Sequence, residues 1–386
     1  MASVRSYFDY NATVPVKPEV VKAVTEALSL GGNPSSVHGA GRMARRMVED
    51  ARAKVAALVN AKPSEIVFTS GGTEANNLAL GGLEPKHILI SAIEQDSILT
   101  AAGNFGAECG LIPVDGDGVV TLTDLRTLLE RCKPPTLVSI HHANNETGVI
   151  QPIREAAAIA HGAGAYFHAD AVQTAGRLPV DFKALDVDLM TLSGHKIGGP
   201  QGIGALVVRD GLDLAPLQRG AQERGRRGGT ENLAGIVGFG MAATLTPQDR
   251  ADMERIGQLR DEIERRLCAA APAALVFGRK APRLANTSCI SMPGVHSETQ
   301  VMALDLAGVE VSAGAACSAG KVTRSHVLEA MAVDLETSRC AIRISLGWKT
   351  TPEDVERLVE AWTVLYARTR TSARQAGSVE EARLDG

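Results

Sequence analysis

The sequence predicts an α/β fold in which a mostly parallel sheet lies between helices, joined to a smaller α+β domain. Between about residues 18 and 210, strand-like apolar runs alternate with segments whose apolar residues recur every three or four positions. Such alternation is typical of a parallel sheet flanked by helices. The chain of 386 residues exceeds the usual size of one compact core, which favours two domains.

The predicted strands follow one another through the first half of the chain. They are Glu65–Ser70, His87–Ala92, Leu137–His141, Ala165–Asp170, Asp188–Ser193 and Gly204–Arg209. Between them, segments such as Ala40–Val59 and Ile153–His161 carry the apolar spacing of amphipathic helices. Because ligands bind at the carboxyl ends of the strands in an open α/β sheet, we expect the functional site there.

The smaller domain is expected after a Gly- and Arg-rich segment at Gly220–Thr230, which resembles a functional loop more than a packed element. Pro247 and the charged helix Asp249–Ala270 mark the change of pattern. The other elements predicted for this domain are strands Ser288–Met292 and Ala341–Ser345 and a last helix, Pro352–Ala367.

These patterns give predicted boundaries for the whole chain. The large domain is expected over residues 14–245, and the small domain over residues 1–13 and 246–370. Residues 371–386 are polar and rich in small side chains, which predicts a disordered tail.

Composition narrows the classes of partner. The net charge of −4 and a pI near 6.2 give no electrostatic reason to expect nucleic acid or an anionic membrane surface. No segment reaches about 18 uninterrupted apolar residues, and Met1–Tyr10 lacks a long apolar run, so we expect a cytoplasmic protein. Six cysteines without a C-x-x-C pair indicate reduced thiols and no intrinsic metal site.

Two charged residues follow neighbouring predicted strands. Asp170 ends the strand in His168–Gln173, and Lys196 follows the strand that ends at Ser193. A Lys that can form a Schiff base and a carboxylate that can keep a pyridine nitrogen protonated are what pyridoxal phosphate (PLP) needs. Each residue alone is more often a solvated Lys or a turn Asp, so the prediction depends on the rest of the chain.

Two further segments lie at predicted strand ends. Thr69–Glu74 joins a strand to a helix through two glycines, and amides at a helix N-terminus bind phosphate. Asn145 follows another strand and could donate to a cofactor oxygen, although an Asx turn is its alternative role. Together with Asp170 and Lys196, these segments favour a cofactor with a phosphate group.

Cys317 and Arg343 are candidate functional residues in the second half of the chain. Cys317 lies in Ser312–Gly320, where nearly every residue is small, which favours a loop that presents the thiol over a packed strand. A buried or incidental cysteine is the alternative. Arg343 interrupts an apolar strand and suits either a structural ion pair or bidentate capture of a substrate carboxylate.

Taken together, these segments resemble the cysteine desulfurases of the NifS/IscS-like group, within the class-V (fold-type I) family of PLP-dependent aminotransferases. The motifs that carry the resemblance are Tyr7–Thr13, Gly32–His38, Thr69–Asn77, Asn144–Gly148, His168–Gln173, Ser193–Lys196 and Ala341–Gly347. They span nearly the whole chain except the tail. The resemblance implies a fold-type I transferase with a mostly parallel, seven-stranded sheet in the large domain and the catalytic Cys loop in the small one.

The resemblance also implies a role for individual residues. Lys196 is the Schiff-base lysine, and Asp170 pairs with the pyridine nitrogen of PLP. The other residues implied to contact the cofactor are Gly72, Thr73, Gln95, Asn145, Gln173, Ser193, Gly194, His195 and Thr230, the last from the second subunit of a homodimer. Those implied to bind the substrate are Asn11, Asn145 and Arg343.

The implied reaction removes sulfur from L-cysteine and gives L-alanine. Cys317 is the sulfur acceptor in this reaction and carries the sulfur as a persulfide to an iron–sulfur scaffold or another acceptor protein. The only metal role implied is transient ligation of an iron–sulfur cluster by Cys317 together with that scaffold. The segment Ser345–Trp348 and a tail without a scaffold-docking motif favour a nitrogen-fixation role over a housekeeping one, and the acceptor stays unidentified.

One position departs from the resemblance. The family usually has a His stacked on the cofactor ring where this chain has Gln95. A Gln side chain is planar and can lie on the ring, but it does not titrate near neutral pH. We therefore expect the cofactor to bind while the proton-transfer steps are altered or slowed.

Two alternative functions stay open. The first is a related PLP lyase or aminotransferase, such as a selenocysteine lyase, in which Cys317 is incidental. The second is a catalytically weakened regulatory homologue, which Gln95 motivates.

Overall fold

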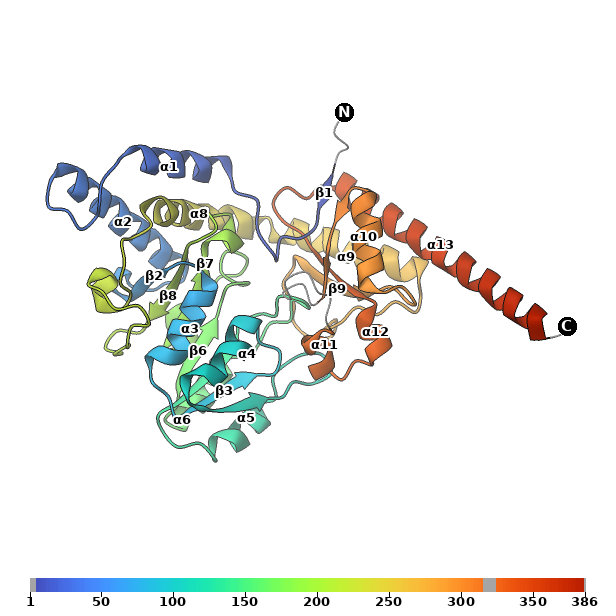
Figure 1. Cartoon of the computed structure of the whole chain (residues 1–386), viewed down its shortest axis with the longest axis horizontal. Helices are drawn as coiled ribbons and strands as arrows, with labels where there is room; N and C mark the ends of the chain where they lie inside the picture. The colour runs from blue at the N-terminus through green and yellow to red at the C-terminus, as the bar shows by residue number, and fades with distance from the viewer. Residues whose placement is uncertain (1–4, 315–323, 385–386) are drawn as a thin grey trace. The chain divides into compact units, whose positions relative to one another are not determined.

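The chain divides into two compact units (Figure 1). The computed structural model describes residues 5–314 and 324–384, with side chains to residue 370. Residues 11–145 and 149–252 form what we call the large unit, and residues 1–10, 146–148 and 253–386 form the small unit. Cys317 lies outside the described residues.

A seven-stranded sheet forms the centre of the large unit, as the resemblance implied. Its order is β2-β8-β7-β6-β5-β3-β4, and its members are β2 (Ile66–Thr69), β3 (His87–Ser91), β4 (Glu108–Ile112), β5 (Thr136–His141), β6 (Tyr166–Asp170), β7 (Leu189–Ser193) and β8 (Gly204–Val208). β8 runs antiparallel to both β2 and β7, and the other neighbours are parallel. The prediction of a mostly parallel sheet is therefore confirmed.

Helices cover both faces of this sheet. One face packs against α2 (Gly39–Leu58), α5 (Leu122–Leu129), α6 (Ile153–Gly162) and α8 (Leu233–Ala251) in the largest core cluster. The other face packs against α3 (Gly72–Gly82) and α4 (Asp96–Ala102). Side chains alternate between the faces along each strand: Val207 belongs to the first cluster, and Leu206 and Val208 belong to the second. Strands buried on both faces read as continuous apolar runs, which is why the sequence predicts them well.

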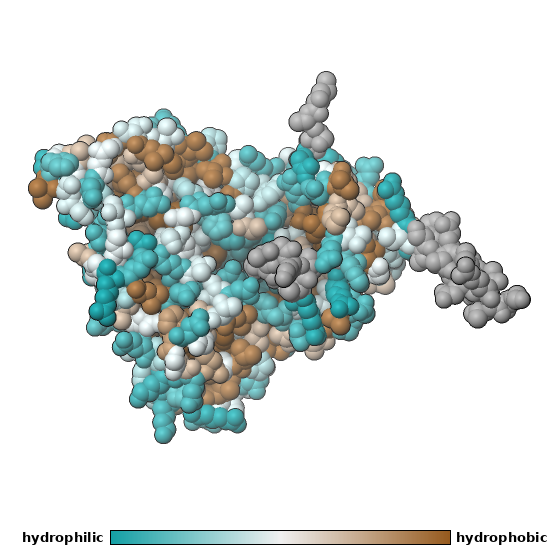
Figure 2. Space-filling model, viewed as in Figure 1, coloured by the Kyte–Doolittle hydropathy of each residue, from teal (hydrophilic) through white to brown (hydrophobic). Residues whose placement is uncertain are grey.

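The remaining helices of the large unit are α1 (Pro18–Ser29) and the short α7 (Phe182–Leu185). α1 buries Val20, Ala23 and Ala27, while Val21 and Leu28 are exposed. Figure 2 shows hydrophobic surface over this helix. The exposed side of α1 is therefore partly apolar.

The charged helix expected over Asp249–Ala270 begins a few residues later in the structure, at Met253. Pro247 lies inside α8, which ends at Ala251. A proline removes the N–H that would bond the carbonyl four residues earlier, and here the Thr246 hydroxyl donates to the carbonyl of Ala243 at 2.9 Å instead. The helix therefore continues, and the two units divide at Asp252 and Met253.

The small unit contains a three-stranded antiparallel sheet, ordered β11-β12-β9. Its strands are β9 (Thr287–Ser291), β11 (Ser312–Ala313) and β12 (Ala341–Ser345), and β1 (Ser6–Tyr7) pairs separately with β10 (Val309–Glu310). The helices are α9 (Met253–Ala270), α10 (Ser297–Leu306), α11 (His326–Ala330), α12 (Leu335–Arg339) and α13 (Pro352–Leu384). The core of this unit buries Phe8, Ile342 and Trp362 completely.

The last helix extends further than the sequence pattern predicts. α13 continues to Leu384 through most of the segment for which we expected disorder. Good helix formers such as Ala, Arg, Gln and Glu are frequent between 371 and 384, and this local propensity accounts for the difference. In the described part of the chain, none of the helices combines the length and the apolar character needed to cross a membrane.

Candidate active site

The two charged residues singled out in the sequence lie at the ends of neighbouring strands of the same sheet. Asp170 is the last residue of β6, and Lys196 lies in the 3-10 turn Gly194–Ile197 directly after β7. β6 and β7 are parallel, and Asp170 pairs in register with Thr191. Both residues therefore lie toward the carboxyl edge of the large unit's sheet, as predicted.

Asp170 is a buried carboxylate held by N–H groups. Its Oδ1 accepts from the backbone N–H of Val172 at 2.9 Å, and its Oδ2 accepts from Asn76 Nδ2 at 2.8 Å. Burial raises the pKa of this carboxyl, and the hydrogen bonds from Asn76 and Val172 oppose that shift. A cation placed next to Asp170 would favour the ionised form.

Lys196 belongs to a cluster organised by the segment that precedes α1. Its Nζ donates to the carbonyl oxygens of Asn11 at 2.6 Å and of Ala12 at 2.9 Å. Gln173 Nε2 donates to the same Asn11 carbonyl at 3.1 Å, and Asn11 Nδ2 donates to the carbonyl of Asn145 at 3.1 Å. Four residues that the sequence assigned to cofactor or substrate thus lie together.

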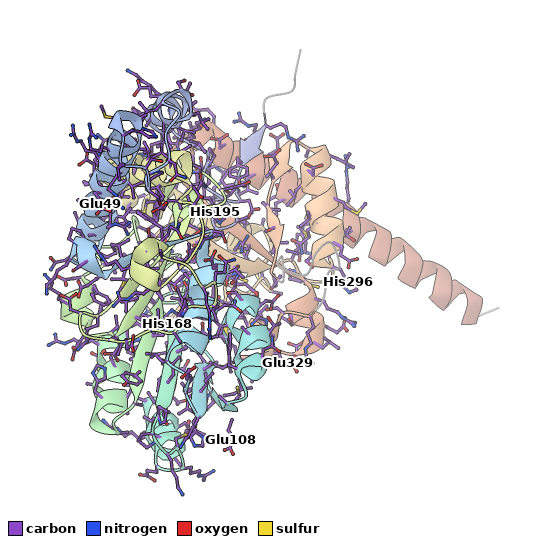
Figure 3. The ribbon with its side chains drawn as sticks, turned by 60° about the vertical axis from the view of Figure 1, so that its left-hand side comes forward. Glu49, Glu108, His168, His195, His296 and Glu329 are labelled. Atoms are coloured by element: carbon purple, nitrogen blue, oxygen red, sulfur yellow. The ribbon has the colours of Figure 1, made fainter. Side chains whose placement is uncertain are left out.

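His195, labelled in Figure 3, is tied to the same segment. Its Nδ1 lies 3.2 Å from Thr13 Oγ1, and its carbonyl accepts from the backbone N–H of Val14 at 3.0 Å. Burial lowers the pKa of His195 from 6.5 to about 4, and the charge of Lys196 lowers it further in the same direction. The imidazole is therefore neutral at pH 7 and can accept or donate a hydrogen bond without adding charge.

Gly72 is the first residue of α3, and it lies close to two other segments, at Val172 and at Ser193. A Cβ built at this residue would lie 3.2 Å from Val172 Cγ2 and 3.6 Å from Ser193 Cβ. The first turn of α3, which contains Gly72 and Thr73, therefore lies beside Ser193 and the segment after Asp170. This arrangement places the predicted phosphate residues Gly72, Thr73 and Ser193 in one region.

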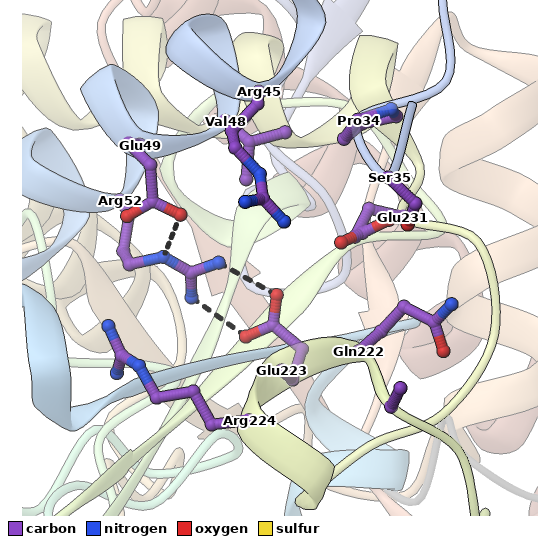
Figure 4. A pocket seen from close by; sticks show the side chains of 11 residues that line it. Pro34, Ser35, Arg45, Val48, Glu49, Arg52, Gln222, Glu223, Arg224 and Glu231 are labelled. Carbon is purple, nitrogen blue, oxygen red and sulfur yellow. Dashed lines mark hydrogen bonds and ion pairs between the residues drawn. The ribbon is translucent and has the colours of Figure 1, made fainter. Parts of the chain in front are cut away.

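The Gly- and Arg-rich loop is fastened to the large unit by two ion pairs. Glu223 forms a bidentate pair with Arg52, at 2.7 and 2.8 Å (Figure 4). Glu223 also accepts from the backbone N–H of Phe68. Arg227 pairs with Glu74 of α3 at 2.8 Å. Thr230, at the end of this loop, is exposed, so the loop holds it at a fixed place on the surface of the large unit.

A cavity of about 490 Å³ lies beside this loop. Arg45, Glu49 and Arg52 of α2 line it on one side, and Glu223 and Arg224 line it on the other (Figure 4). Both loop residues have a positive φ, 47° for Glu223 and 58° for Arg224. The ion pair with Arg52 therefore holds a backbone conformation that non-glycine residues rarely adopt.

Arg343 lies in the small unit and is held by a carboxylate. It is 2% exposed on β12, and its Nη2 donates to Asp9 Oδ1 at 2.7 Å. This contact orients the guanidinium. Asp9 was not singled out from the sequence, although it belongs to the quoted motif Tyr7–Thr13.

Gln95 is the N-cap residue of α4 and is half-buried. Its Oε1 accepts from Ser97 Oγ, and Ser97 in turn contacts Asn76, the residue that holds Asp170. Neither Asn76 nor Ser97 was singled out from the sequence. The signal available for Asn76 was the pair Asn76-Asn77, two amides directly before the apolar residues Leu78–Leu80 of α3.

Comparisons with known proteins identify the family. The model of the family "Aminotransferase class-V" matches residues 6–358. A cysteine desulfurase IscS of Dictyoglomus turgidum is 41% identical over 95% of this chain and 95% of its own length. A cysteine desulfurase of Cereibacter sphaeroides is 42% identical over 92% of this chain and 94% of its own length.

Solved structures agree with this assignment. A NifS-like protein from Rickettsia africae matches with a TM-score of 0.88 and 36% identity, covering 94% of this chain and 99% of that one. A structure described as SspA in complex with cysteine matches with a TM-score of 0.78 and 32% identity, over 89% of this chain and 99% of that one. The chain therefore belongs to the class-V aminotransferase family of fold-type I PLP enzymes, in its NifS/IscS-like cysteine desulfurase group.

Proposed function

We propose that this protein is a PLP-dependent cysteine desulfurase that converts L-cysteine to L-alanine and carries the sulfur as a persulfide on Cys317. The observation that carries the proposal is the placement of Asp170 and Lys196 at the ends of neighbouring strands, each held by neutral hydrogen-bonding groups. The relatives named as cysteine desulfurases support the choice of substrate.

The residues of the large unit fit PLP. A buried carboxylate whose pKa is raised by burial suits a protonated pyridine nitrogen, because the cation would compensate the desolvated charge of Asp170. A Cβ at Gly72 would crowd Val172, so the glycine lets the start of α3 approach that segment, and the first-turn amides of the helix would bind the phosphate. Ser193, Gly194, His195 and Thr73 would complete the phosphate site, and Asn145 and Gln173 would meet the phenolic oxygen.

The chain's own groups divide the remaining work. When bound, PLP supplies an electron sink for the α-carbon of the substrate. The Lys196 amine, once it is free, removes and returns the proton at that carbon. Arg343, oriented by Asp9, binds the substrate carboxylate through its guanidinium, and Asn11 and Asn145 are the further substrate contacts that we propose.

Cys317 performs the sulfur transfer. Its thiolate attacks the sulfur of the substrate, so that an S–S bond forms while the Cβ–S bond of cysteine breaks. The electron pair of the broken bond stays on the substrate carbon, which takes up a proton and leaves as L-alanine. The step is balanced without an external oxidant or reductant.

The partners that we propose follow from the same assignment. A homodimer would bring the exposed Thr230 to the phosphate site of the second subunit, and the fastened loop that carries it supports this role. A scaffold for iron–sulfur clusters or another sulfur acceptor, in the cytoplasm, would remove the persulfide sulfur.

A substitution at Cys317 tests the proposal. The purified holoenzyme is mixed with L-cysteine, and both alanine and protein-bound persulfide are measured. Cys317→Ala should still bind PLP and cysteine but form no persulfide, whereas the matched control Cys109→Ala, which removes an exposed thiol on β4, should behave as the wild type. Sulfur release that persists in Cys317→Ala would favour the alternative of a PLP lyase such as a selenocysteine lyase.

Gln95 motivates a second candidate function, a catalytically weakened regulatory homologue. Its amide cannot move a proton near neutral pH. In Gln95→His, the desulfurase proposal expects faster alanine formation, and an unchanged rate counts against a proton-transfer role at this position. PLP binding without any turnover in the wild type would favour the regulatory candidate.

A further inference from the structure

A chain of hydrogen bonds joins Gln95 to Asp170 inside the large unit. Ser97 Oγ donates to Gln95 Oε1 at 2.5 Å, Asn76 Nδ2 donates to Ser97 Oγ at 2.9 Å, and the same Asn76 nitrogen donates to Asp170 Oδ2 at 2.8 Å. The four residues come from the start of α4, from α3 and from the end of β6. These three segments are separate in the sequence, and only the fold brings them together.

The carboxylate at one end sets the direction of every bond in this chain. An ionised Asp accepts only, and a primary amide has two N–H donors on its nitrogen. Asn76 therefore gives one N–H to Asp170 and the other to Ser97. Because the Ser97 oxygen accepts from Asn76, its own hydrogen goes to Gln95 Oε1, and the Gln95 nitrogen is left as a donor at the far end.

The orphaned oxygen of Asn76 shows that this orientation matters. Asn76 is 1% exposed and Ser97 is 8% exposed. In the described part of the chain, Asn76 Oδ1 is buried and has no hydrogen-bond partner. Leaving a buried acceptor unpaired costs free energy, and a flipped amide would instead set this oxygen against the Asp170 carboxylate. The structure therefore bears one unsatisfied atom and keeps both N–H groups of Asn76 aimed at Asp170 and Ser97.

We propose that Asn76 and Ser97 are positioning residues, which lock the Gln95 side chain as a fixed N–H donor and couple its orientation to Asp170. This inference rests on the proposed function, because Asp170 and Gln95 are the residues proposed to contact PLP. In this chain, position 95 contributes a directed dipole in place of a titrating group. Ser97 supplies the hydroxyl that a glutamine needs to be held in one orientation.

The test uses the visible absorbance spectrum of bound PLP and its dissociation constant, together with kcat. In Ser97→Ala, the Gln95 amide loses its partner, and we expect a changed spectrum and a fall of about 3- to 10-fold in kcat or in PLP affinity, the size of one hydrogen bond. Ser97→Thr keeps a hydroxyl and should restore the wild-type spectrum. The matched control is Thr100→Ala, since Thr100 is exposed on the same helix and its hydroxyl bonds only its own helix, at the carbonyl of Asp96.

A double substitution separates coupling from a general loss of structure. If Ser97 acts through Gln95, Ser97→Ala combined with Gln95→Leu should change the spectrum and PLP affinity no more than Gln95→Leu alone. Additive effects would overturn the proposal, and so would a wild-type spectrum, affinity and kcat in a folded Ser97→Ala. PLP binding and its spectrum do not need turnover, so a wild type that binds PLP without releasing sulfur would refute the desulfurase assignment and leave this test intact.

Discussion

Asp170 and Glu223 are both buried carboxylates of the large unit, but they are held in opposite ways. Glu223 is 8% exposed and faces Arg52 in a bidentate ion pair. Asp170 is 7% exposed and is held by the N–H groups of Asn76 and Val172. The structure therefore compensates one charge with a directly bonded opposite charge, whereas the groups that bond the other carboxylate are neutral N–H donors.

The difference follows from what each group has to do. Glu223 fastens the loop that carries Thr230, and a permanent ion pair suits a permanent contact. Asp170 is proposed to receive a cation that arrives with the cofactor, so a built-in cation would compete for the same place. Burial without a cation raises the pKa of Asp170 and leaves a site that is stabilised when a positive charge binds.

The same chemical change, acid to amide, should therefore have opposite effects at the two sites. For Asp170→Asn we expect a fall in kcat of roughly 100- to 1000-fold, as when one preorganised electrostatic group is removed from an active site. The folding stability of the PLP-free protein should change little, because the substitution also removes a charge that burial disfavours. Alanine formation by the PLP-loaded enzyme and urea denaturation after PLP has been removed measure the two quantities, and a large loss of stability in the PLP-free protein would contradict the comparison.

For Glu223→Gln we expect the reverse, a loss of about 3–5 kcal/mol in the free energy of unfolding, because Arg52 keeps a buried charge without its partner. The matched control is Glu49→Gln, which removes the second carboxylate near Arg52, at 3.3 Å and 53% side-chain exposure. An exposed partner of this kind contributes about 0–1 kcal/mol. Urea denaturation measures the free energy of unfolding of both variants. Equal losses in the two variants would mean that the Arg52–Glu223 pair is not the main interaction that holds the loop.

The sequence predicts single residues at strand ends better than the interactions that hold the site and the loop. Asp170 and Lys196 could be placed because they follow apolar runs, and the carboxyl ends of parallel strands share one edge. Asn76, Ser97 and the Arg52–Glu223 pair depend on how helices and loops far apart in the chain pack on that sheet: Arg52 and Glu223 are 171 positions apart. β4 was not among the predicted strands of the sheet, and it lies at the sheet edge with mostly exposed residues.

His168 gives the smallest expected effect and tests whether neutral partners can hold a buried charge. It is fully buried between Ser139 Oγ at 2.8 Å and Thr191 Oγ1 at 2.9 Å, and Figure 3 labels it. Burial lowers its pKa from 6.5 to about 3. Between these two values the unfolded chain binds a proton that the folded protein does not, so stability falls as the pH falls below about 7.

The expected loss from this one residue is about 2 kcal/mol between pH 7 and pH 5. His142 and His195 also have lowered pKa values, so the wild type alone does not isolate the contribution of His168. His168→Gln removes it, and the difference between wild type and variant in the pH dependence of urea denaturation measures it. If the two proteins lose equal stability on acidification, hydroxyl groups can accommodate a charge at this depth, and burial next to neutral dipoles would then no longer explain the raised pKa of Asp170.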